Sequence, residues 1–315
     1  YLTNNKGERF MEKYAAKFME LAPRDIVSRS EMTEILEGRG YPGPNGLDFV
    51  HLDLRHLGAD RINHALPLIR EVCIKFLDLD PIKEPIPVRP VAHYSMGGVE
   101  CDLRGACKAK GVWAAGEVAC VSMHGANRRG CNSTAECLVW GDICGSESVK
   151  YMKTNPALPA APIAAAEAEE KRVFGTVLGQ SGPENPYAIR EELRTLMDQH
   201  MGVYRDGKQM QEGLQKLAGL RKRFASIGVA DKGKVYNSNM VNVLETENLL
   251  DLAEVMITAA LAREESRGGH ARRDFTTRDD VKFLRHTLAK KGLKGPELDY
   301  KPVTITRWKP VERKY

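Results

Sequence analysis

The spacing of apolar residues in the first quarter of the chain predicts short helices and strands in alternation. Apolar positions recur every three or four residues over 8–21 and again over 24–40, which is typical of two amphipathic helices, and Pro23 separates them. Residues 47–57 alternate between apolar and polar as a half-buried strand does, and 59–77 carry the broad apolar face of a helix. We therefore expect a mixed α and β region here.

The middle of the chain predicts a strand, a polar loop and a helix in succession. Residues 80–90 contain four prolines and are expected to form a stiff, extended connector. A short apolar run at 112–115 indicates a strand that stops at a Gly-Glu turn, and a helix is expected over 133–144. Ser133 is the expected N-cap, because Glu136 follows three residues later and completes a capping box.

The start of this helix is a candidate binding site. Small residues precede it, so first-turn N–H groups and the partial positive charge of the helix would be open to a phosphate, a carboxylate or a flavin carbonyl. A purely structural loop-to-helix connection explains the same residues equally well. The pattern alone leaves both interpretations open.

The second half of the chain is dominated by helical periodicity. Leucine and methionine residues at helical spacing within 163–267 predict an antiparallel bundle of three or four helices, with these side chains in its core. Residues 278–288 fit a further helix or a turn, and 298–315 alternate as a strand that ends basic and aromatic. That end is expected to be a solvated edge or a strand on which a partner docks.

Composition excludes several classes of protein. The 315 residues are 42% hydrophobic and 28% charged, as in ordinary soluble proteins, and they suffice for one or two domains. The net charge of +5 comes without a dense basic stripe interleaved with aromatic residues, so no nucleic-acid partner is expected. No apolar run reaches the roughly 18 residues of a membrane span, and no signal peptide is recognisable.

Cysteine usage and the first residue indicate where the chain comes from. The seven cysteines include no C-x-x-C pair, so neither zinc nor an iron–sulfur cluster is expected and no residue is assigned to a metal. Free thiols in a reducing compartment are the default. The chain begins at Tyr1, in the middle of a pattern, and we expect it to be a fragment of a longer protein.

Two further residues are candidates for chemistry. Arg24 opens the second predicted helix, where a solvated surface arginine is the commoner outcome. His93 lies in an extended stretch just before the Gly97-Gly98 pair, which would allow the close approach of a ligand or of another strand. Residue type and position alone favour a structural role for both side chains.

Several motifs together resemble the flavoprotein subunit of succinate dehydrogenase/fumarate reductase, in the FAD-dependent oxidoreductase 2 family. They occur in the order of the family and extend over essentially the whole chain. The motifs are APRDIVSRSEMTEILEGRG (22–40), DLRHLGADRINHALPLIRE (53–71), DPIKEPIPV (80–88), RPVAHYSMGG (89–98), GVWAAGEVACVSMHGANRRGCNS (111–133) and YKPVTITRWKPVERKY (300–315).

The resemblance implies a fold of the α+β or α/β class that corresponds to the C-terminal half of such a subunit. Residues 1–80 would be the remainder of a capping domain with a helical connector. Residues 81–155 would be the C-terminal part of a Rossmann-like FAD-binding domain, with the substrate loop. Residues 156–315 would be a C-terminal helical domain with a terminal strand. The G-x-G-x-x-G segment of the family is not among these residues.

The resemblance also implies the residues that handle the substrate. Arg24 matches the arginine that exchanges a proton with the substrate carbon, and is the implied catalytic residue. His93 matches a histidine on one substrate carboxylate, and Arg128 matches the arginine that grips the other carboxylate region. A dicarboxylate needs such fixed positive donors, since an arginine offers a planar fork and a histidine a single donor.

Three residues are implied for the cofactor, FAD. Glu117 matches the acid that binds ribityl or ribose hydroxyls of the flavin. Ser133 and Thr134 match backbone groups that touch the isoalloxazine ring, although Thr134 stands where the family usually has leucine. Cys131 replaces a small serine, glycine or alanine of the usual loop, which is a mild change.

The implied reaction is the interconversion of succinate and fumarate by hydride transfer to or from N5 of FAD. Electrons would pass to an iron–sulfur subunit and a quinone, with a membrane-anchor subunit in the same complex. The implied location is peripheral, on the cytoplasmic face of the inner or plasma membrane, or on the matrix side of the mitochondrial inner membrane. An L-aspartate oxidase is the alternative enzyme. An inert fragment or interaction protein is the alternative outside catalysis, because the isolated chain is not expected to hold FAD.

Overall fold

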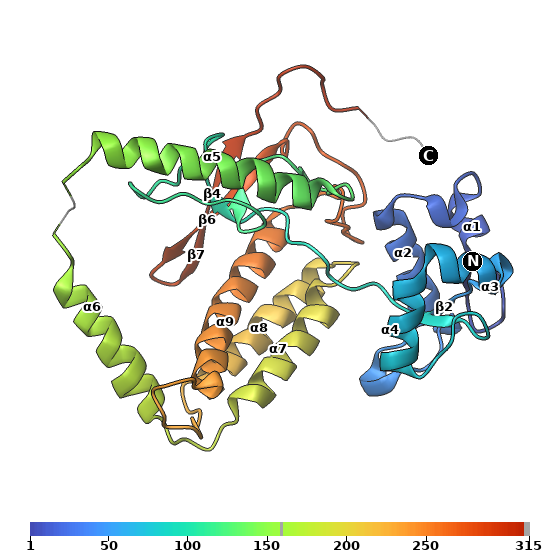
Figure 1. Ribbon diagram of the computed structural model, residues 1–315, viewed down its shortest axis with the longest axis horizontal. Helices are drawn as coiled ribbons and strands as arrows, with labels where there is room; N and C mark the ends of the chain where they lie inside the picture. Colours follow the sequence, from blue (N-terminus) through green and yellow to red (C-terminus); the bar gives the residue numbers. More distant parts are fainter. Residues whose placement is uncertain (158–159, 312–315) are drawn as a thin grey trace. The chain divides into compact units, whose positions relative to one another are not determined.

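The computed structural model describes residues 1–157 and 160–311, which form two compact units (Figure 1). The first unit consists of residues 1–93 together with residues 307–311, and the second consists of the described residues of 94–306. The first has a core of its own around Met11 and Val50. The second has a larger core among helices and a small one around Cys101 and Ala119.

The first unit is built from short elements. They are β1 (Leu2–Thr3), α1 (Met11–Ala15), η1 (Met19–Leu21), α2 (Arg24–Glu34), η2 (Ile35–Arg39), η3 (Pro44–Gly46), β2 (Val50–Leu52), η4 (Arg55–Leu57), α3 (Ala59–Ala65), α4 (Pro67–Leu77) and β3 (Ile86–Val88). The three strands pair antiparallel in the order β1-β2-β3. The proline-rich connector thus ends in an edge strand, a position where Pro87 leaves no internal hydrogen bond unmade.

Two predictions for the first unit need correction. The expected helix over 59–77 is two helices, because Pro67 cannot donate a helical hydrogen bond and Leu66 leaves the helical region at φ −131° and ψ 36°. The expected strand over 47–57 is limited to the three residues of β2, after which the chain turns into η4.

The second unit begins with a small parallel pair and a long helix. β4 (Val99–Glu100) pairs with β5 (Ala119–Cys120), and α5 (Asn132–Thr154) follows. The strand predicted at 112–115 is wrong, since only an isolated bridge from Trp113 to Ala106 forms there. Positive φ angles at Gly105 and Gly111 fold this segment into a tight local loop, which leaves no run long enough for a ladder.

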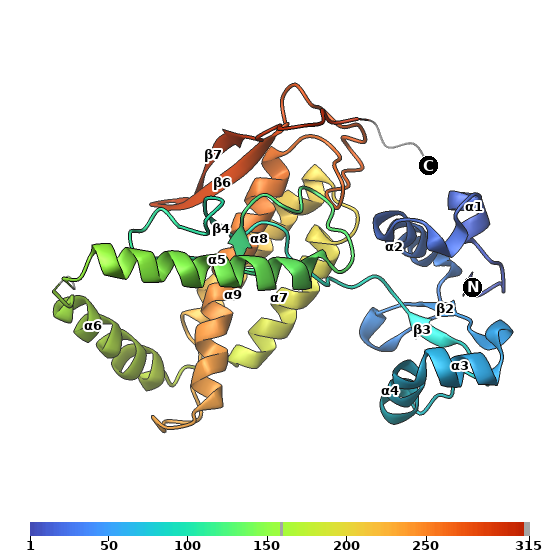
Figure 2. The ribbon, with the colours of Figure 1, turned by 45° about the horizontal axis from the view of Figure 1, so that its top comes forward.

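The predicted bundle is present as three long helices that pack side by side in both views (Figure 2). The helical elements of this region are α6 (Ile163–Glu170), η5 (Lys171–Val177), α7 (Pro186–Met201), α8 (Gly207–Phe224) and α9 (Ser238–Ala262). Asn185, Asp206 and Asn237 cap the N-termini of α7, α8 and α9 through their side-chain oxygens. Ile189 and Leu217 are fully buried in the core between these helices.

A β-hairpin follows the bundle and lies against α9. It consists of β6 (Arg285–Gly292) and β7 (Gly295–Pro302), which pair antiparallel. The helix or turn expected over 278–288 is a turn that leads into β6. The strand predicted over 298–315 is present only as far as Pro302. Residues 312–315 of that prediction lie outside the described residues.

Through residues 1–157 and 160–311, no helix has both the length and the apolar character that a membrane crossing requires.

Candidate functional site

The first turn of α5 is open to a ligand. Cys131 precedes the helix in a left-handed conformation, with φ 68° and ψ −19°, and no side chain caps the first turn. Ser133 was expected to be the N-cap, and this prediction is wrong: Ser133 lies inside the first turn. The first turn carries no acidic residue, so its N–H groups and the positive end of the helix dipole face no carboxylate of their own.

Glu136 does not complete a capping box but holds two other side chains. It is 1% exposed, and its Oε2 accepts a hydrogen bond from the Tyr94 hydroxyl. The same oxygen lies 2.6 Å from Nε2 of His124, whose side chain is also buried. Burial, followed by the bond to Glu136, raises the pKa of Tyr94 above its ordinary value, so the phenol remains a donor. The carboxylate is satisfied by a phenol and an imidazole.

Arg128 lies beside Tyr94, and some of its N–H donors make no hydrogen bond to described residues. Its guanidinium carbon is 4.7 Å from the centre of the Tyr94 ring, a cation–π contact. Its backbone N–H donates to Sδ of Met96 at 3.0 Å, and its Nη1 donates to the Arg129 carbonyl at 3.0 Å. Its Nε is buried, and no described residue bonds it. Arg128 is therefore oriented by the protein while part of its fork remains available to a ligand.

The Gly97-Gly98 pair and Glu117 lie just before the two short paired strands, β4 and β5 respectively. Oε1 of Glu117 accepts the backbone N–H of Ser95 at 2.7 Å, and the side chain is otherwise exposed. Gly98 has a φ of 118°, and a Cβ there would lie 2.2 Å from the Val118 carbonyl oxygen. The close backbone approach predicted for the Gly97-Gly98 pair is thus confirmed at Gly98.

The second unit therefore brings four of the six predicted site residues onto one segment. Glu117 lies just before β5, Arg128 belongs to the loop between β5 and α5, and Ser133 and Thr134 belong to the first turn of α5. Their proximity follows from the local sequence, since they fall within a short stretch of chain.

The other two predicted residues belong to the first unit. Arg24 is the first residue of α2 and is exposed, and His93 is exposed in the extended segment that closes the unit. Neither side chain has a hydrogen-bond or ion-pair partner among residues 1–157 and 160–311. Both keep all of their donors for a ligand.

Sequence reasoning missed the residues that support Arg128. Tyr94, His124 and Glu136 come from an extended segment, a loop and a helix, and Met96 comes from the first of these. The available signal was Glu136 itself. An acid that is buried in a helix needs hydrogen-bond partners. The Tyr94 and His124 side chains that bond it lie in the motifs 89–98 and 111–133, which the sequence had already indicated.

The comparisons with known proteins match both ends of the chain. Residues 1–134 match the family model described as "FAD binding domain", and residues 190–315 match the one described as "Fumarate reductase flavoprotein C-term". The chain belongs to the succinate dehydrogenase/fumarate reductase flavoprotein family. The family predicted from the sequence motifs is thereby confirmed.

Relatives of this flavoprotein are similar along its whole length. The fumarate reductase flavoprotein subunit of Serratia sp. is 41% identical over 100% of this chain and 55% of its own length. The succinate dehydrogenase flavoprotein subunit of Rickettsia bellii is 40% identical over 97% of the chain and 53% of its own. A solved E. coli quinol fumarate reductase has a TM-score of 0.92 and 39% identity, covering 99% of this chain and 55% of that one. The flavoprotein chain thus spans about half the length of the curated relatives it matches.

FAD is the cofactor of this flavoprotein family, and the residues present fit it. The uncapped first turn of α5 offers N–H groups that a flavin carbonyl would accept. Glu117 has a second carboxylate oxygen that no described residue engages, and it suits a flavin hydroxyl. No cluster of His, Cys, Asp and Glu within residues 1–157 and 160–311 is arranged to hold a metal ion.

Proposed function

We propose that the flavoprotein containing this chain interconverts succinate and fumarate, and that Arg128 binds one substrate carboxylate. The observation that carries the proposal is the guanidinium of Arg128, stacked on Tyr94 with a buried Nε that no described residue bonds. It lies on the loop that leads to the open first turn of α5. An oriented fork of this kind suits a planar carboxylate.

The chain's other residues would divide the remaining tasks. Glu117 would accept a hydroxyl of the cofactor, and the backbone N–H groups of Ser133 and Thr134 would donate to its ring. FAD, when bound, supplies the two-electron acceptor or donor for a hydride. His93 would donate to the second substrate carboxylate.

Arg24 would move the proton that accompanies the hydride. An arginine is a weak acid, with a pKa above about 12, and this role needs a site from which water is excluded. In such a site an adjacent cation and a developing negative charge on the substrate carbon both favour proton release. The support for Arg24 is its match to the family motif and its side chain, which no described residue engages.

The partners follow from the same family. The electrons would pass to an iron–sulfur subunit and on to a quinone, and the complex would reach a membrane through an anchor subunit. One solved relative is a "Quinol-Fumarate Reductase with Menaquinol Molecules", which supports quinol chemistry in that protein. The flavoprotein itself would be peripheral, on the cytoplasmic face of the inner or plasma membrane or on the mitochondrial matrix side.

The test replaces Arg128 in the FAD-loaded flavoprotein. Arg128→Ala is expected to lower succinate turnover by about 100-fold or more, because the substrate loses an oriented charged donor. The FAD absorbance per protein should stay at the wild-type level. Turnover is measured as succinate-dependent dye reduction and, in the other direction, as fumarate-dependent reoxidation.

Arg129→Ala is the matched control, since the exposed Arg129 contributes only its backbone carbonyl to Arg128, and alanine keeps that carbonyl. Undiminished turnover in Arg128→Ala would remove the assignment. Faster turnover of L-aspartate than of succinate by the wild-type protein would select the L-aspartate oxidase alternative.

A further inference from the structure

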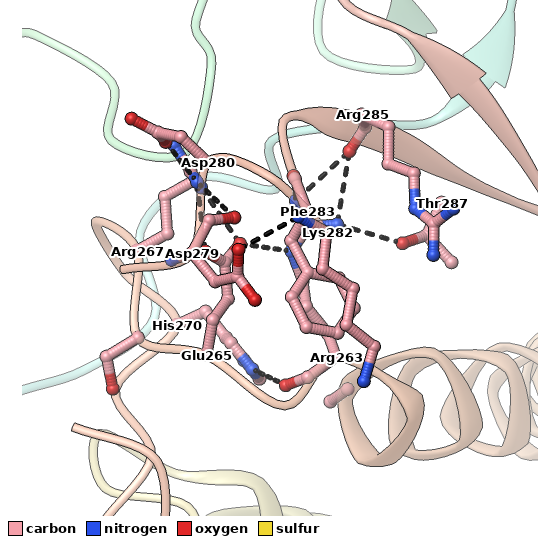
Figure 3. A network of polar contacts seen from close by, with 12 residues as sticks. Arg263, Glu265, Arg267, His270, Asp279, Asp280, Lys282, Phe283, Arg285 and Thr287 are labelled. Atoms are coloured by element: carbon pink, nitrogen blue, oxygen red, sulfur yellow. Dashed lines mark hydrogen bonds and ion pairs between the residues drawn. The ribbon is translucent and has the colours of Figure 1, made fainter. Parts of the chain in front are cut away.

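A buried cluster of charged side chains lies between the end of α9 and the start of β6 (Figure 3). At its centre is Glu265, which is 0% exposed. Its carboxylate accepts from Nε of Arg263 at 3.0 Å and from Nε and Nη2 of Arg267 at 2.8 and 2.9 Å. It also accepts the backbone N–H of Asp279 at 3.0 Å. A buried carboxylate with this many donors fixes the residues around it.

The two arginines extend the cluster to neighbouring segments. Arg267 also reaches Oδ1 of Asp280 at 2.7 Å. Arg263 donates from Nη1 and Nη2 to the Arg285 carbonyl at 3.1 and 3.0 Å, and from Nη1 to Oγ1 of Thr287 at 3.1 Å. The cluster thereby ties the end of α9 to β6.

His270 is fixed from both sides of its ring. Its Nε2 lies 2.9 Å from the Arg263 carbonyl, and its Nδ1 lies 2.8 Å from Nη1 of Arg205. Burial, aided by the charges of Arg205 and Arg272, lowers the pKa of His270 to about 4, so the ring is neutral at neutral pH. A neutral ring can donate from Nε2 while Nδ1 accepts from the arginine, which satisfies both contacts.

These contacts hold a tight turn whose tip contacts the loop between β5 and α5, which carries Arg128. Arg267 and His270 exchange backbone hydrogen bonds of 2.8 and 3.0 Å across the turn. At the tip, the N–H of Gly269 donates to the Ala126 carbonyl at 2.8 Å. Gly268 has a φ of 60°, and a Cβ there would lie 2.2 Å from that same carbonyl oxygen. Only glycine permits this approach.

The hydrogen bond from Gly269 to Ala126 can affect the position of Arg128 in two ways. Ala126 lies two residues before Arg128 on the same loop. Met96 accepts the backbone N–H of Arg128 through its sulfur, and its Cε would lie 3.6 Å from a Cβ built on Gly269. The turn therefore bonds the chain that leads to Arg128 and lies close to the Met96 side chain, which accepts the backbone N–H of Arg128.

We propose that the Arg267–His270 turn is a positioning device for Arg128, with Glu265 fixing the turn and Gly268 setting its approach to Ala126. The proposal rests on the function proposed above for Arg128. None of these residues is among those proposed above to bind the substrate. A shift of the loop by about 1 Å is enough to misplace a substrate-orienting group, and such misplacement costs up to about 100-fold in rate.

The test is Gly268→Ala in the FAD-loaded flavoprotein. The added methyl must push Ala126 away, so the KM for succinate and the dissociation constant of malonate should each rise about tenfold or more. Malonate binding is followed by the change it causes in the flavin absorbance, which requires no turnover. FAD content should stay at the wild-type level.

Gly269→Ala is the matched control. Its Cβ would lie 3.6 Å from its nearest neighbours, an ordinary contact, and alanine keeps the backbone N–H. Wild-type malonate affinity in Gly269→Ala together with weakened affinity in Gly268→Ala supports the proposal. Equal affinity in both variants and the wild type overturns it. A wild-type protein that neither binds malonate nor oxidises succinate would instead remove the proposed function, and this inference with it.

A second variant decides the matter if Gly268→Ala does not fold. Asp280→Asn removes one partly exposed partner of Arg267 and leaves the buried Glu265 intact. A rise of about threefold in the malonate dissociation constant, with an unchanged melting temperature, supports the positioning role. A wild-type dissociation constant in Asp280→Asn overturns it.

Discussion

At the scale of single residues, two buried glutamates differ in whether hydrogen-bond partners stabilise their carboxyl groups. The carboxylate of Glu136 is enclosed and bonded by Tyr94 and His124, whereas the carboxyl group of Glu31 on α2 has no hydrogen-bond or ion-pair partner among the described residues. Burial alone raises the pKa of Glu31 to about 7. One acid organises the candidate site, and the other weakens the fold when it ionises.

Glu31 makes the stability of the first unit depend on pH. Between the ordinary glutamate pKa of 4.5 and about 7, the unfolded chain has lost the proton that the folded chain keeps. The free energy of unfolding therefore falls as pH rises through this window, by on the order of 3 kcal/mol, and stays low above it. Glu31→Gln should raise the melting temperature at pH 8 and change it little at pH 4.5.

Thermal unfolding across the pH range checks this expectation, with Glu12→Gln as the control because Glu12 is exposed on α1. A stabilisation by Glu31→Gln that is the same at every pH would show that ionisation is not its cause.

At the scale of elements, local signals predicted the helices better than the connections. The start of α2 after Pro23 and the bundle helices follow from the spacing of their apolar residues. The strand expected at 112–115 failed because glycines turn the chain there. The N-cap expected at Ser133 failed because the helix already begins at Asn132, and Glu136 bonds Tyr94 and His124 instead of completing a capping box.

The caps of the bundle helices can be tested singly. Asp206 accepts the N–H groups of Lys208 and Gln209 at 2.9 and 3.3 Å, at the start of α8. Asp206→Ala leaves these donors without their acceptor and should lower the free energy of unfolding by about 1 kcal/mol. Urea denaturation measures the change. Glu212→Ala, at an exposed position of the same helix, should have almost no effect, and an equal loss in both variants would argue against capping.

At the scale of the whole molecule, the chain is two units with separate cores. The family could be predicted from the sequence, because its motifs are continuous stretches of chain, and Arg128, Ser133 and Thr134 lie together because they are neighbours along the chain. The support from the Gly268-Gly269 turn could not, because it depends on a contact between remote segments.

Separate cores predict separate responses to a core substitution. Leu217 is 0% exposed in the bundle core, and Leu217→Ala should lower the stability of the second unit by about 2–5 kcal/mol. Peptides from the first unit should keep their protection. Hydrogen exchange at increasing urea, resolved by peptide, measures both units at once. Leu252→Ala, at a side chain that is 57% exposed, is the control. Equal loss of protection in both units would contradict independent cores.

The bond between Gly269 and Ala126 also sets an order of events during synthesis. The loop that carries Arg128 is synthesised long before the Arg267–His270 turn, because Gly268 and Gly269 are translated only after α5 and the whole helical bundle. At about 5–20 residues per second, the nascent loop waits roughly 7–28 s without this hydrogen bond. The loop therefore gains the Gly269 hydrogen bond to Ala126 only after translation has passed His270.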